Sequence, residues 1–349
     1  FIDLECKGFW LANQLNYNKL MQEKNELKKI VYLDRAGLPE RFIVRTPETP
    51  HVWIDYSKSR PDQVIERSKG AAVLISNKVQ ITEEILLACP TVKHIAVSAT
   101  GFNIIDIEAC QRLGVSVSNV PNYAATTVAE HAITSALMLR RSLNSYRHKV
   151  ISGEWQKSAS FCLFAEPVND INGATFGIIG FGELGQATAQ KAHALGMNVI
   201  FHSKSQHQSP FAKQVSFDDL VAQSDIISLH CSLNADTENL INLTQLKRMK
   251  PHCLLINTAR GGVANEADVV NAIKQNIIGG IAFDTLVEEP PSINSPLLSI
   301  ANRDNVIVTP HIAWASEQAM QSLTHILADN IEGFLIGQPK NIVSWLCRA

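Results

Sequence analysis

The chain has 349 residues, of which 46% are hydrophobic and 18% are charged, and its net charge is −2 at pH 7. This balance is typical of a globular protein, and the length allows two domains with large cores. The small net charge gives no reason to expect binding to nucleic acid or to a membrane surface, and no apolar run is long enough to span a bilayer. Seven scattered cysteines without C-x-x-C pairs favour reduced thiols, no metal site and a cytoplasmic location.

The first 28 residues do not have the pattern of an α/β domain, and we expect an N-terminal extension there. Met21 shortly precedes the first strand signal, so we expect a natural start close to it. Two alternatives remain open for residues 1–20, a poorly ordered segment or a helix packed on the surface. No signal peptide is expected, because the first 30 residues lack an apolar core followed by small residues.

Strands and helices alternate from Lys29 to Asn119, which predicts a parallel sheet covered by helices. A loop of small residues, Ser98–Gly101, follows the third strand at the edge of the sheet where ligands bind in such folds. The predicted strands are Ile30–Leu33, Ala72–Ile75, His94–Val97 and Val115–Val117. The predicted helices are Pro61–Lys69, Thr82–Ala88, with Thr82 as N-cap, and Ile105–Leu113.

A crossing between domains is indicated at Val120–Tyr123, and one long helix is predicted over Thr126–Asn144. The helix is very apolar, for instance at Ile133 and Leu139. Such a helix must be covered, by the other domain or by a second subunit. An irregular loop over Trp155–Asn172 follows it.

The stretch Thr175–Lys204 has the pattern of a dinucleotide-binding unit. An apolar strand, Phe176–Ile179, is followed by glycines in the spacing G-x-G-x-x-G, then by a helix over Leu184–Leu195 that ends at Gly196, and by a second strand over Val199–Phe201. A lone glycine pattern is weak, but with both strands and the helix in place it predicts a nucleotide site rather than a structural turn.

Each glycine of this pattern has its own physical reason. Gly180 permits the tight turn out of the strand, and Gly182 lets a pyrophosphate approach the backbone. Gly185 lets the helix pack closely on the strand. The N-terminus of the helix then offers N–H groups and the positive end of its dipole to the phosphates.

The alternation continues after this stretch and gives about six strands from Phe176 onward, enough for a complete doubly wound domain. The further predicted strands are Ile226–Leu229, Leu254–Ile256, Ile281–Phe283 and Val306–Val308. The further predicted helices are Phe217–Ala222, Leu240–Met249, Glu266–Gln275 and Ser316–Ile336.

Polar side chains follow consecutive strands of this second domain: Arg260, Glu289 in a loop after Asp284, and His311. Strand ends gather along one edge of a doubly wound sheet, so these groups can converge beside the cofactor. Each has a structural alternative on its own: a packed histidine, a surface ion pair, a solvated acid or a turn cap. Their joint position at strand ends favours a chemical role.

The three side chains suit the reduction of a keto acid. The planar fork of Arg260 can bind the carboxylate and the carbonyl of the substrate. His311 can donate the proton that the alkoxide needs, and Glu289 can hold one imidazole nitrogen and keep the ring protonated. Hydride from C4 of a nicotinamide completes the reaction.

Four segments resemble the motifs of the D-isomer-specific 2-hydroxyacid dehydrogenases, and their order and spacing match over roughly Lys29–Gly337. These segments are Gly180–Gly185, Asn257–Gly261, Asp284–Pro291 and Thr309–Ala313. The resemblance implies reduction of a 2-keto acid to the D-2-hydroxy acid, with Arg260, Glu289 and His311 as the catalytic set. It implies a homodimer with the Thr126 helix at its interface.

The resemblance also implies two doubly wound parallel-sheet domains, a Rossmann cofactor domain inserted into a flavodoxin-like substrate domain. The expected boundaries are 1–28 for the extension, 29–118 with 318–349 for the substrate domain, and 119–317 for the cofactor domain. The substrate is expected to contact Ala99, Thr100, Gly101, Arg260 and His311. The cofactor is expected to contact Gly180, Gly182, Glu183, Leu184, Gly185, Ser203, Lys204, Cys231, Thr258 and Asp284.

Within the family, Gly153–Trp155 and Phe161–Phe164 with Pro167 are most similar to glycerate dehydrogenases, also called hydroxypyruvate reductases. This similarity predicts hydroxypyruvate or glyoxylate as substrate, although the aromatic residues could equally serve loop packing. Ser203 stands where members that use NAD carry an acid, and Lys204 follows it, so we expect NADP to be preferred and keep NAD as the alternative. A second hypothesis is a dinucleotide-sensing corepressor-like protein with little turnover.

Overall fold

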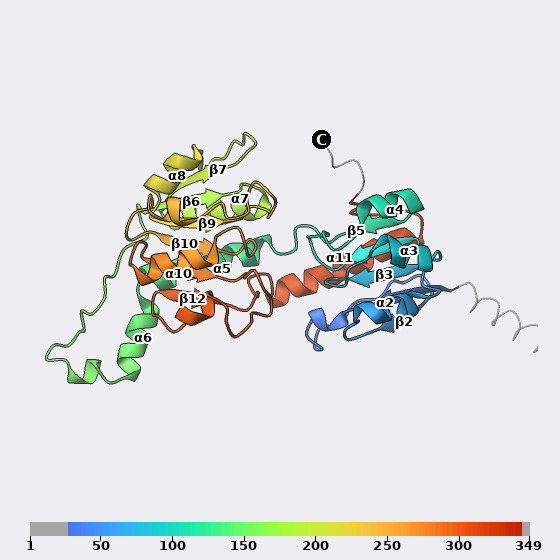
Figure 1. Ribbon diagram of the computed structural model, residues 1–349, viewed down its shortest axis with the longest axis horizontal. Helices are drawn as coiled ribbons and strands as arrows, with labels where there is room; N and C mark the ends of the chain where they lie inside the picture. Colours follow the sequence, from blue (N-terminus) through green and yellow to red (C-terminus); the bar gives the residue numbers. More distant parts are fainter. Residues whose placement is uncertain (1–26, 344–349) are drawn as a thin grey trace, which may run out of the picture. The chain divides into compact units, whose positions relative to one another are not determined.

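The computed structural model describes residues 27–343, so the predictions for residues 1–20 and Met21 lie outside the described part of the chain. The chain divides into two compact units (Figure 1). Within the described residues, one unit combines 27–123 with 320–343, and the other is Ala124–Ala319. Within residues 27–343, no helix is long and apolar enough to cross a membrane.

The first unit is built on a five-stranded parallel sheet in the order β2-β1-β3-β4-β5, the flavodoxin-like order. The last helix of the chain, α11 (Glu317–Leu335), lies mostly in this unit. The strands are β1 (Lys28–Tyr32), β2 (His51–Asp55), β3 (Val73–Ser76), β4 (His94–Val97) and β5 (Ser116–Ser118). The helices before the crossing are η1 (Arg35–Gly37), α2 (Pro61–Ser68), α3 (Glu83–Ala88) and α4 (Ile107–Leu113).

The second unit has a seven-stranded parallel sheet in the order β12-β11-β10-β9-β6-β7-β8. Strand order reverses between β6 and β9, which makes this the switch point of a Rossmann sheet. Its strands are β6 (Thr175–Ile179), β7 (Asn198–His202), β8 (Lys213–Gln214), β9 (Ile226–Leu229), β10 (Leu254–Asn257), β11 (Gly280–Phe283) and β12 (Val306–Val308). Its helices are α5 (Ala125–Arg140), α6 (Leu143–Ile151), η2 (Trp155–Lys157), α7 (Glu183–Ala194), α8 (Phe217–Gln223), α9 (Leu243–Leu246), α10 (Glu266–Lys274) and η3 (Leu297–Ile300).

Apolar layers cover both faces of the second sheet. Ile179 belongs to the layer that includes side chains of α8 and α10, whereas its neighbour Ile178 belongs to the layer that includes side chains of α5 and α7. Successive residues of a strand point to opposite faces, so a continuous apolar run fits a strand buried on both sides. The predicted fold class, two doubly wound parallel-sheet domains, is confirmed.

The prediction of one long helix over Thr126–Asn144 is wrong in two respects, the residue at which the helix ends and the surface that covers its apolar face. The helix stops at Arg140, and Ser142 has a left-handed φ of 50° before α6 begins. The apolar pattern ends at Leu139, so nothing holds the following polar residues in the same helix. Ala132, Ile133, Ala136 and Leu139 pack on the sheet of their own unit instead of requiring a second subunit.

Three smaller elements also differ from the sequence prediction. The predicted helix at Leu240–Met249 shrinks to α9, since the Asn242 side chain accepts from Thr244 N at 3.0 Å and starts the helix there. Thr82 is the N-cap residue of α3, but its side chain makes no capping hydrogen bond. The edge strands β2 and β8 were not predicted, because one is half-exposed and the other has only two residues.

Candidate active site

The glycine turn between β6 and α7 lies at the switch point of the second sheet. Gly180 has a φ of +92°, and a Cβ there would lie 2.6 Å from the backbone nitrogen of Cys231. A Cβ on Gly185 would lie 2.2 Å from the carbonyl oxygen of Gly180. A Cβ on Gly182, by contrast, would meet no heavy atom within 4 Å. Two glycines therefore permit close packing, and Gly182 faces open space where a ligand can approach the backbone.

The same edge carries unsatisfied polar groups that fit a dinucleotide. Gly182 is the N-cap residue of α7 and offers no capping side chain, so the first N–H groups of the helix remain available to an anion. Of the four buried side-chain atoms that lack a hydrogen-bond partner in the described chain, three lie at this edge: His230 Nδ1, Thr258 Oγ1 and Thr285 Oγ1. Each belongs to a residue just past the end of β9, β10 or β11. Of these residues, only Thr258 was predicted, and the signal for the others is their place after a strand.

The side chains of His311 and Glu289 form a hydrogen-bonded pair. His311 Nδ1 lies 2.6 Å from Glu289 Oε2, and both side chains are about one-third exposed, at 31% and 30%. The backbone N–H of Leu286 donates to the other carboxylate oxygen, Glu289 Oε1, at 2.9 Å. Glu289 is thus fixed through both oxygens, and it orients the imidazole with Nε2 on the far side of the ring.

Asp284 fixes the loop that carries His311. Its carboxylate is buried and accepts from Thr309 Oγ1 at 2.5 Å, from Ile312 N at 2.9 Å and from Ala313 N at 2.8 Å. The N–H of His311 also donates to the Asp284 carbonyl oxygen at 2.9 Å. These bonds hold His311 in a left-handed backbone conformation, with φ at 55°, which is uncommon for a residue other than glycine.

Arg260 is an exposed residue in the loop next to the loop that carries Glu289. Its Nη1 donates to the carbonyl oxygen of Ala259 at 2.7 Å, and its own carbonyl oxygen accepts from Asn257 Nδ2 at 2.9 Å. The next residue, Gly261, packs so closely that a Cβ there would lie 2.0 Å from the carbonyl carbon of Leu286. The structure therefore brings the loops of Arg260, Glu289 and His311 together at one edge of the sheet.

The remaining predicted cofactor residues lie along the same edge. Glu183 and Leu184 open α7, and Ser203 and Lys204 follow β7. The Ser203 carbonyl oxygen accepts from Gln214 Nε2 at 3.2 Å, and the Lys204 ammonium donates to Asp236. Burial raises the pKa of the Cys231 thiol, which favours its neutral form.

Ala99, Thr100 and Gly101 belong to the first unit, directly after β4. Their loop is fixed through its carbonyl groups: the Thr100 carbonyl oxygen accepts from Asn119 Nδ2 at 2.8 Å, and the Ala99 carbonyl oxygen accepts from Val120 N at 3.0 Å. Within the described residues, the N–H groups of these three residues have no acceptor. The loop therefore offers N–H donors at the carboxyl edge of its own sheet.

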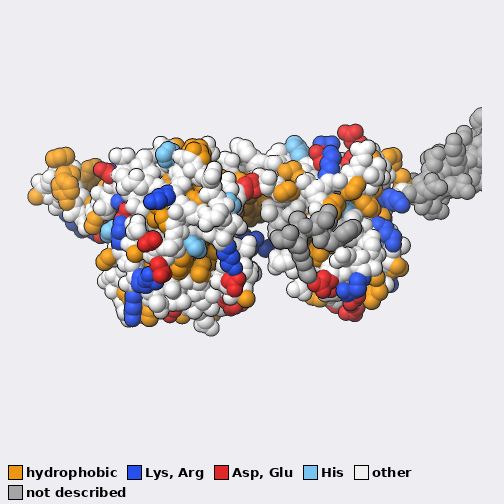
Figure 2. All heavy atoms as spheres, turned by 90° about the horizontal axis from the view of Figure 1, so that it is seen from above, with side chains coloured by type: hydrophobic (Ala, Val, Ile, Leu, Met, Phe, Trp, Pro, Cys, Tyr) orange, Lys and Arg blue, Asp and Glu red, His pale blue; other side chains and the backbone are white. Residues whose placement is uncertain are grey.

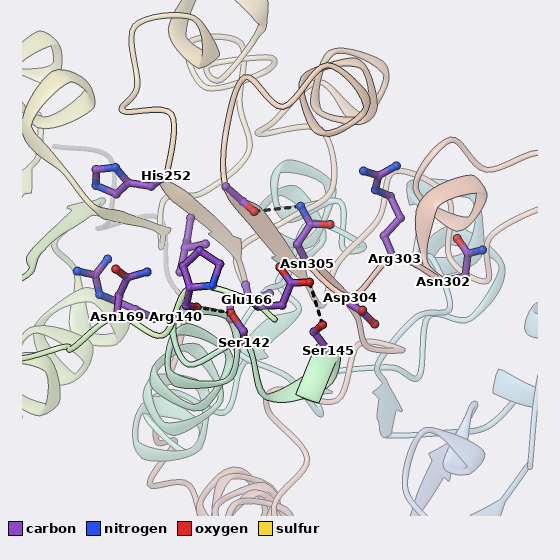
Figure 3. A pocket seen from close by; sticks show the side chains of 14 residues that line it. Arg140, Ser142, Ser145, Glu166, Asn169, His252, Asn302, Arg303, Asp304 and Asn305 are labelled. Carbon is purple, nitrogen blue, oxygen red and sulfur yellow. Dashed lines mark hydrogen bonds between the residues drawn. The ribbon is translucent and has the colours of Figure 1, made fainter. Parts of the chain in front are cut away.

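A cavity of about 570 Å³ lies at the opposite edge of the second sheet, where β10, β11 and β12 begin (Figure 3). Its walls include Leu254, the first residue of β10, and Asn305, whose side chain donates to the Gly279 carbonyl oxygen at 3.0 Å. Ser142 closes another side through its bond to the Pro167 carbonyl oxygen at 2.7 Å. None of the predicted site residues lines this cavity, so it is separate from the candidate active site.

A Rossmann sheet with an open glycine turn at its switch point, and a histidine–carboxylate pair at the same edge, defines a dinucleotide-dependent oxidoreductase. Comparison with known proteins shows to which family of oxidoreductases the chain belongs. Residues 133–313 match the family model described as "D-isomer specific 2-hydroxyacid dehydrogenase, NAD binding domain". The chain belongs to the D-isomer-specific 2-hydroxyacid dehydrogenase family, and it is a nicotinamide-dinucleotide-dependent enzyme that acts on a CH–OH group, as the sequence resemblance predicted.

Three similar proteins illustrate the relationship. The glycerate dehydrogenase of Methylorubrum extorquens is 43% identical over 317 residues, which cover 90% of this chain and 99% of that protein. The hydroxypyruvate reductase of Blautia hydrogenotrophica is 32% identical over 286 residues, 81% of this chain and 88% of that protein. The structure of the acyclic imino acid reductase Bsp5 in complex with NADPH and D-Arg has a TM-score of 0.76 and 28% identity, and the match covers 90% of this chain and 100% of that one.

Proposed function

We propose that this protein reduces a small 2-keto acid, hydroxypyruvate or glyoxylate, to the D-2-hydroxy acid, with His311 as the general acid. The observation that carries the proposal is the pair of His311 Nδ1 and Glu289 Oε2, 2.6 Å apart at the edge that also carries the glycine turn. A bound nicotinamide dinucleotide supplies the hydride. The residues of the chain then position the substrate and deliver the proton.

The proton comes from the nitrogen of His311 that Glu289 does not hold. Glu289 accepts from Nδ1–H, so Nε2–H is the donor left for the developing alkoxide. The carboxylate stabilises the imidazolium that must exist before the proton is given up. In the reverse direction, neutral His311 accepts the hydroxyl proton through the same nitrogen.

Arg260 and the loop at Ala99–Gly101 are proposed to bind the carboxylate of the substrate. The guanidinium is exposed and engages only one carbonyl oxygen, that of Ala259, among its hydrogen bonds in the described chain. Its remaining donors match the two oxygens of a carboxylate. The free N–H groups at Ala99–Gly101 supply neutral donors for the same anion.

A small, polar keto acid is supported by the residues and by the relatives. Ser98, Ala99 and Gly101 are small. Proteins similar to this chain over most of its length are named glycerate dehydrogenase, hydroxypyruvate reductase and glyoxylate reductase. All three names refer to substrates of two or three carbons.

For the cofactor, we propose that NADPH is preferred over NADH. Ser203 has no charge to repel a 2′-phosphate, and Lys204 next to it is a cation at the end of β7. The matching family model is described as an NAD-binding domain, while the Bsp5 structure contains NADPH, so both cofactors occur among similar proteins.

We further propose a cytoplasmic homodimer in which Ala124–Ala319 binds the cofactor and the other unit binds the substrate. The five cysteines in the described part of the chain are free thiols, which suits a reducing compartment.

Hydrophobic side chains gather on the arm that projects from the second unit after α6 (Figure 2). Phe161 and Phe164 are each 91% exposed there, a reason to expect a partner subunit. Exchange of both for serine should shift the mass measured by light scattering to that of a monomer, and an unchanged mass would contradict the role of the arm.

Steady-state kinetics with glyoxylate, hydroxypyruvate and pyruvate, each with NADH and NADPH, test the proposed function. We expect the highest kcat/KM with hydroxypyruvate or glyoxylate and NADPH. A clear preference for branched or aromatic keto acids would contradict the proposed substrate. Tight binding of dinucleotide without appreciable turnover of any 2-keto acid would favour the sensor hypothesis instead.

A further inference from the structure

One ion pair crosses the edge of the second sheet at the glycine turn. The Lys204 ammonium, just after β7, donates to the Asp236 carboxylate in the loop that follows β9. In the strand order β9-β6-β7, the strand that leads into the glycine turn lies between the two. The pair therefore connects loops on either side of β6, at the switch point where a dinucleotide enters a Rossmann sheet.

Both ends of this ion pair are held by further hydrogen bonds. Gln214 Nε2 donates to the carbonyl oxygens of Ser203 and Ser205, at 3.2 and 3.0 Å, on either side of Lys204. The N–H of Asp236 donates to Asn234 Oδ1 at 2.9 Å. The two loops thus present the pair in a defined place, whereas its side chains stay 72% and 69% exposed.

We propose that Asp236 is a specificity-determining residue of the cofactor site, which holds Lys204 and competes with a 2′-phosphate for it. The inference rests on the proposed function, in which Lys204 lies beside the 2′ position of the adenosine ribose. To bind Lys204, the 2′-phosphate of NADPH must replace the Asp236 carboxylate as its partner. The displaced carboxylate then lies close to the phosphate as a second negative charge. NADH brings no phosphate, so the ion pair can persist when it binds.

The size of the effect follows from the exposure of the pair. Exposed ion pairs are weak, and two like charges several ångströms apart in water repel weakly as well, so removal of Asp236 should strengthen phosphate binding by about 3- to 10-fold. The same change should alter the Kd of a ligand that lacks the 2′-phosphate by no more than about twofold, because the Asp236 carboxylate acts only on Lys204 and on the phosphate. Asp236 would then moderate the preference for NADPH without abolishing it.

Isothermal titration of the full-length protein with adenosine 2′,5′-bisphosphate and with AMP tests this directly, because the two probes differ by the 2′-phosphate. We expect Asp236→Asn to lower the Kd of the bisphosphate about 3- to 10-fold and to leave the Kd of AMP unchanged within about twofold. Asp218→Asn is the matched control, because it removes another exposed ion pair of the same unit, that with Arg248 at 2.7 Å. This control should change neither Kd.

A third variant, Lys204→Gln, separates the two levels of the proposal. If Lys204→Gln weakens the bisphosphate but Asp236→Asn leaves its Kd unchanged, Asp236 does not compete and this inference is wrong. If Lys204→Gln changes the Kd of neither probe, Lys204 does not contact the 2′-phosphate, and the proposed preference for NADPH loses the residue on which it rests. In the double variant, the gain from Asp236→Asn should shrink, because the lysine that it releases is gone.

Discussion

Substitution of Asp284 by asparagine should weaken the fold and the catalytic loop together. The carboxylate accepts three hydrogen bonds, from Thr309 Oγ1 and from the N–H groups of Ile312 and Ala313, and it is only 2% exposed. Asparagine has nearly the same shape, but one of its two ends is an amide that donates. One N–H group of the loop would then face another donor in a buried place.

The loss of these contacts should lower the free energy of unfolding. A hydrogen bond to a charged group contributes about 1.5–3 kcal/mol, and an unsatisfied buried donor adds to its loss, so we expect unfolding to be easier by about 2–4 kcal/mol. In a unit of this size, that corresponds to a fall in Tm of roughly 5–15 °C. Because the bonds of Asp284 fix the backbone on both sides of His311, kcat should fall as well, by up to about 100-fold for a displacement near 1 Å.

Denaturant unfolding, kcat/KM for the keto acid and the Kd of the dinucleotide should be measured for Asp284→Asn and for Asp218→Asn. The second variant carries the same chemical change at an exposed ion pair, and it should change each quantity little. If Asp284→Asn retains both the native unfolding free energy and the native kcat/KM, the hydrogen bonds of Asp284 do not hold the His311 loop in place.

Three more outcomes are expected. Arg260→Lys should lower kcat/KM for the keto acid by about 10- to 100-fold, because a point charge cannot replace a bidentate fork, and near-native kinetics would make Arg260 structural. Ser203→Asp should shift the ratio of kcat/KM for NADPH and NADH towards NADH, and a native enzyme that already prefers NADH by about tenfold, 1.4 kcal/mol, would contradict our account of Ser203. Burial alone would raise the pKa of Asp225, but hydrogen bonds from Lys250, the N–H of Thr175 and His252 lower it to about 2 from 3.8. Its stabilisation is therefore complete above pH 4 and is lost as the pH falls towards 2, so acid unfolding of Asp225→Asn should depend less on pH over that range.

The sequence predicted the interior strands of both sheets and the edge strands β5 and β12, but it missed the edge strands β2 and β8. Apolar runs such as Ile226–Leu229 mark central strands of a parallel sheet, and the observed bounds of this one are identical. The edge strand β2 is half-exposed, so its apolar signal is weaker, although Val52-Trp53-Ile54 after Pro50 was a usable strand signal. The end of α5 depends on Ser142, which has a left-handed backbone conformation. A serine in the sequence does not predict that conformation, whereas a glycine does.

The candidate site was predictable where a role follows from residue type and strand position. The Glu289–His311 pair is an example, and it is observed as a hydrogen bond. The part played by Asp284 was not predictable, because its partners lie 25–29 residues later in the chain and meet it only in the folded sheet. The same is true of the ion pair between Lys204 and Asp236, which joins positions 32 residues apart.

The most direct test of the central claim is the reduction of the keto acid by His311→Asn at neutral pH, with dinucleotide affinity measured by fluorescence on the same protein. General acid catalysis contributes about 10²- to 10⁴-fold to a rate, so kcat should fall by that factor. The Kd of the dinucleotide should stay close to the native value, because the glycine turn and α7 are untouched. A variant that turns over at the native rate would contradict the assignment of His311 as the proton donor.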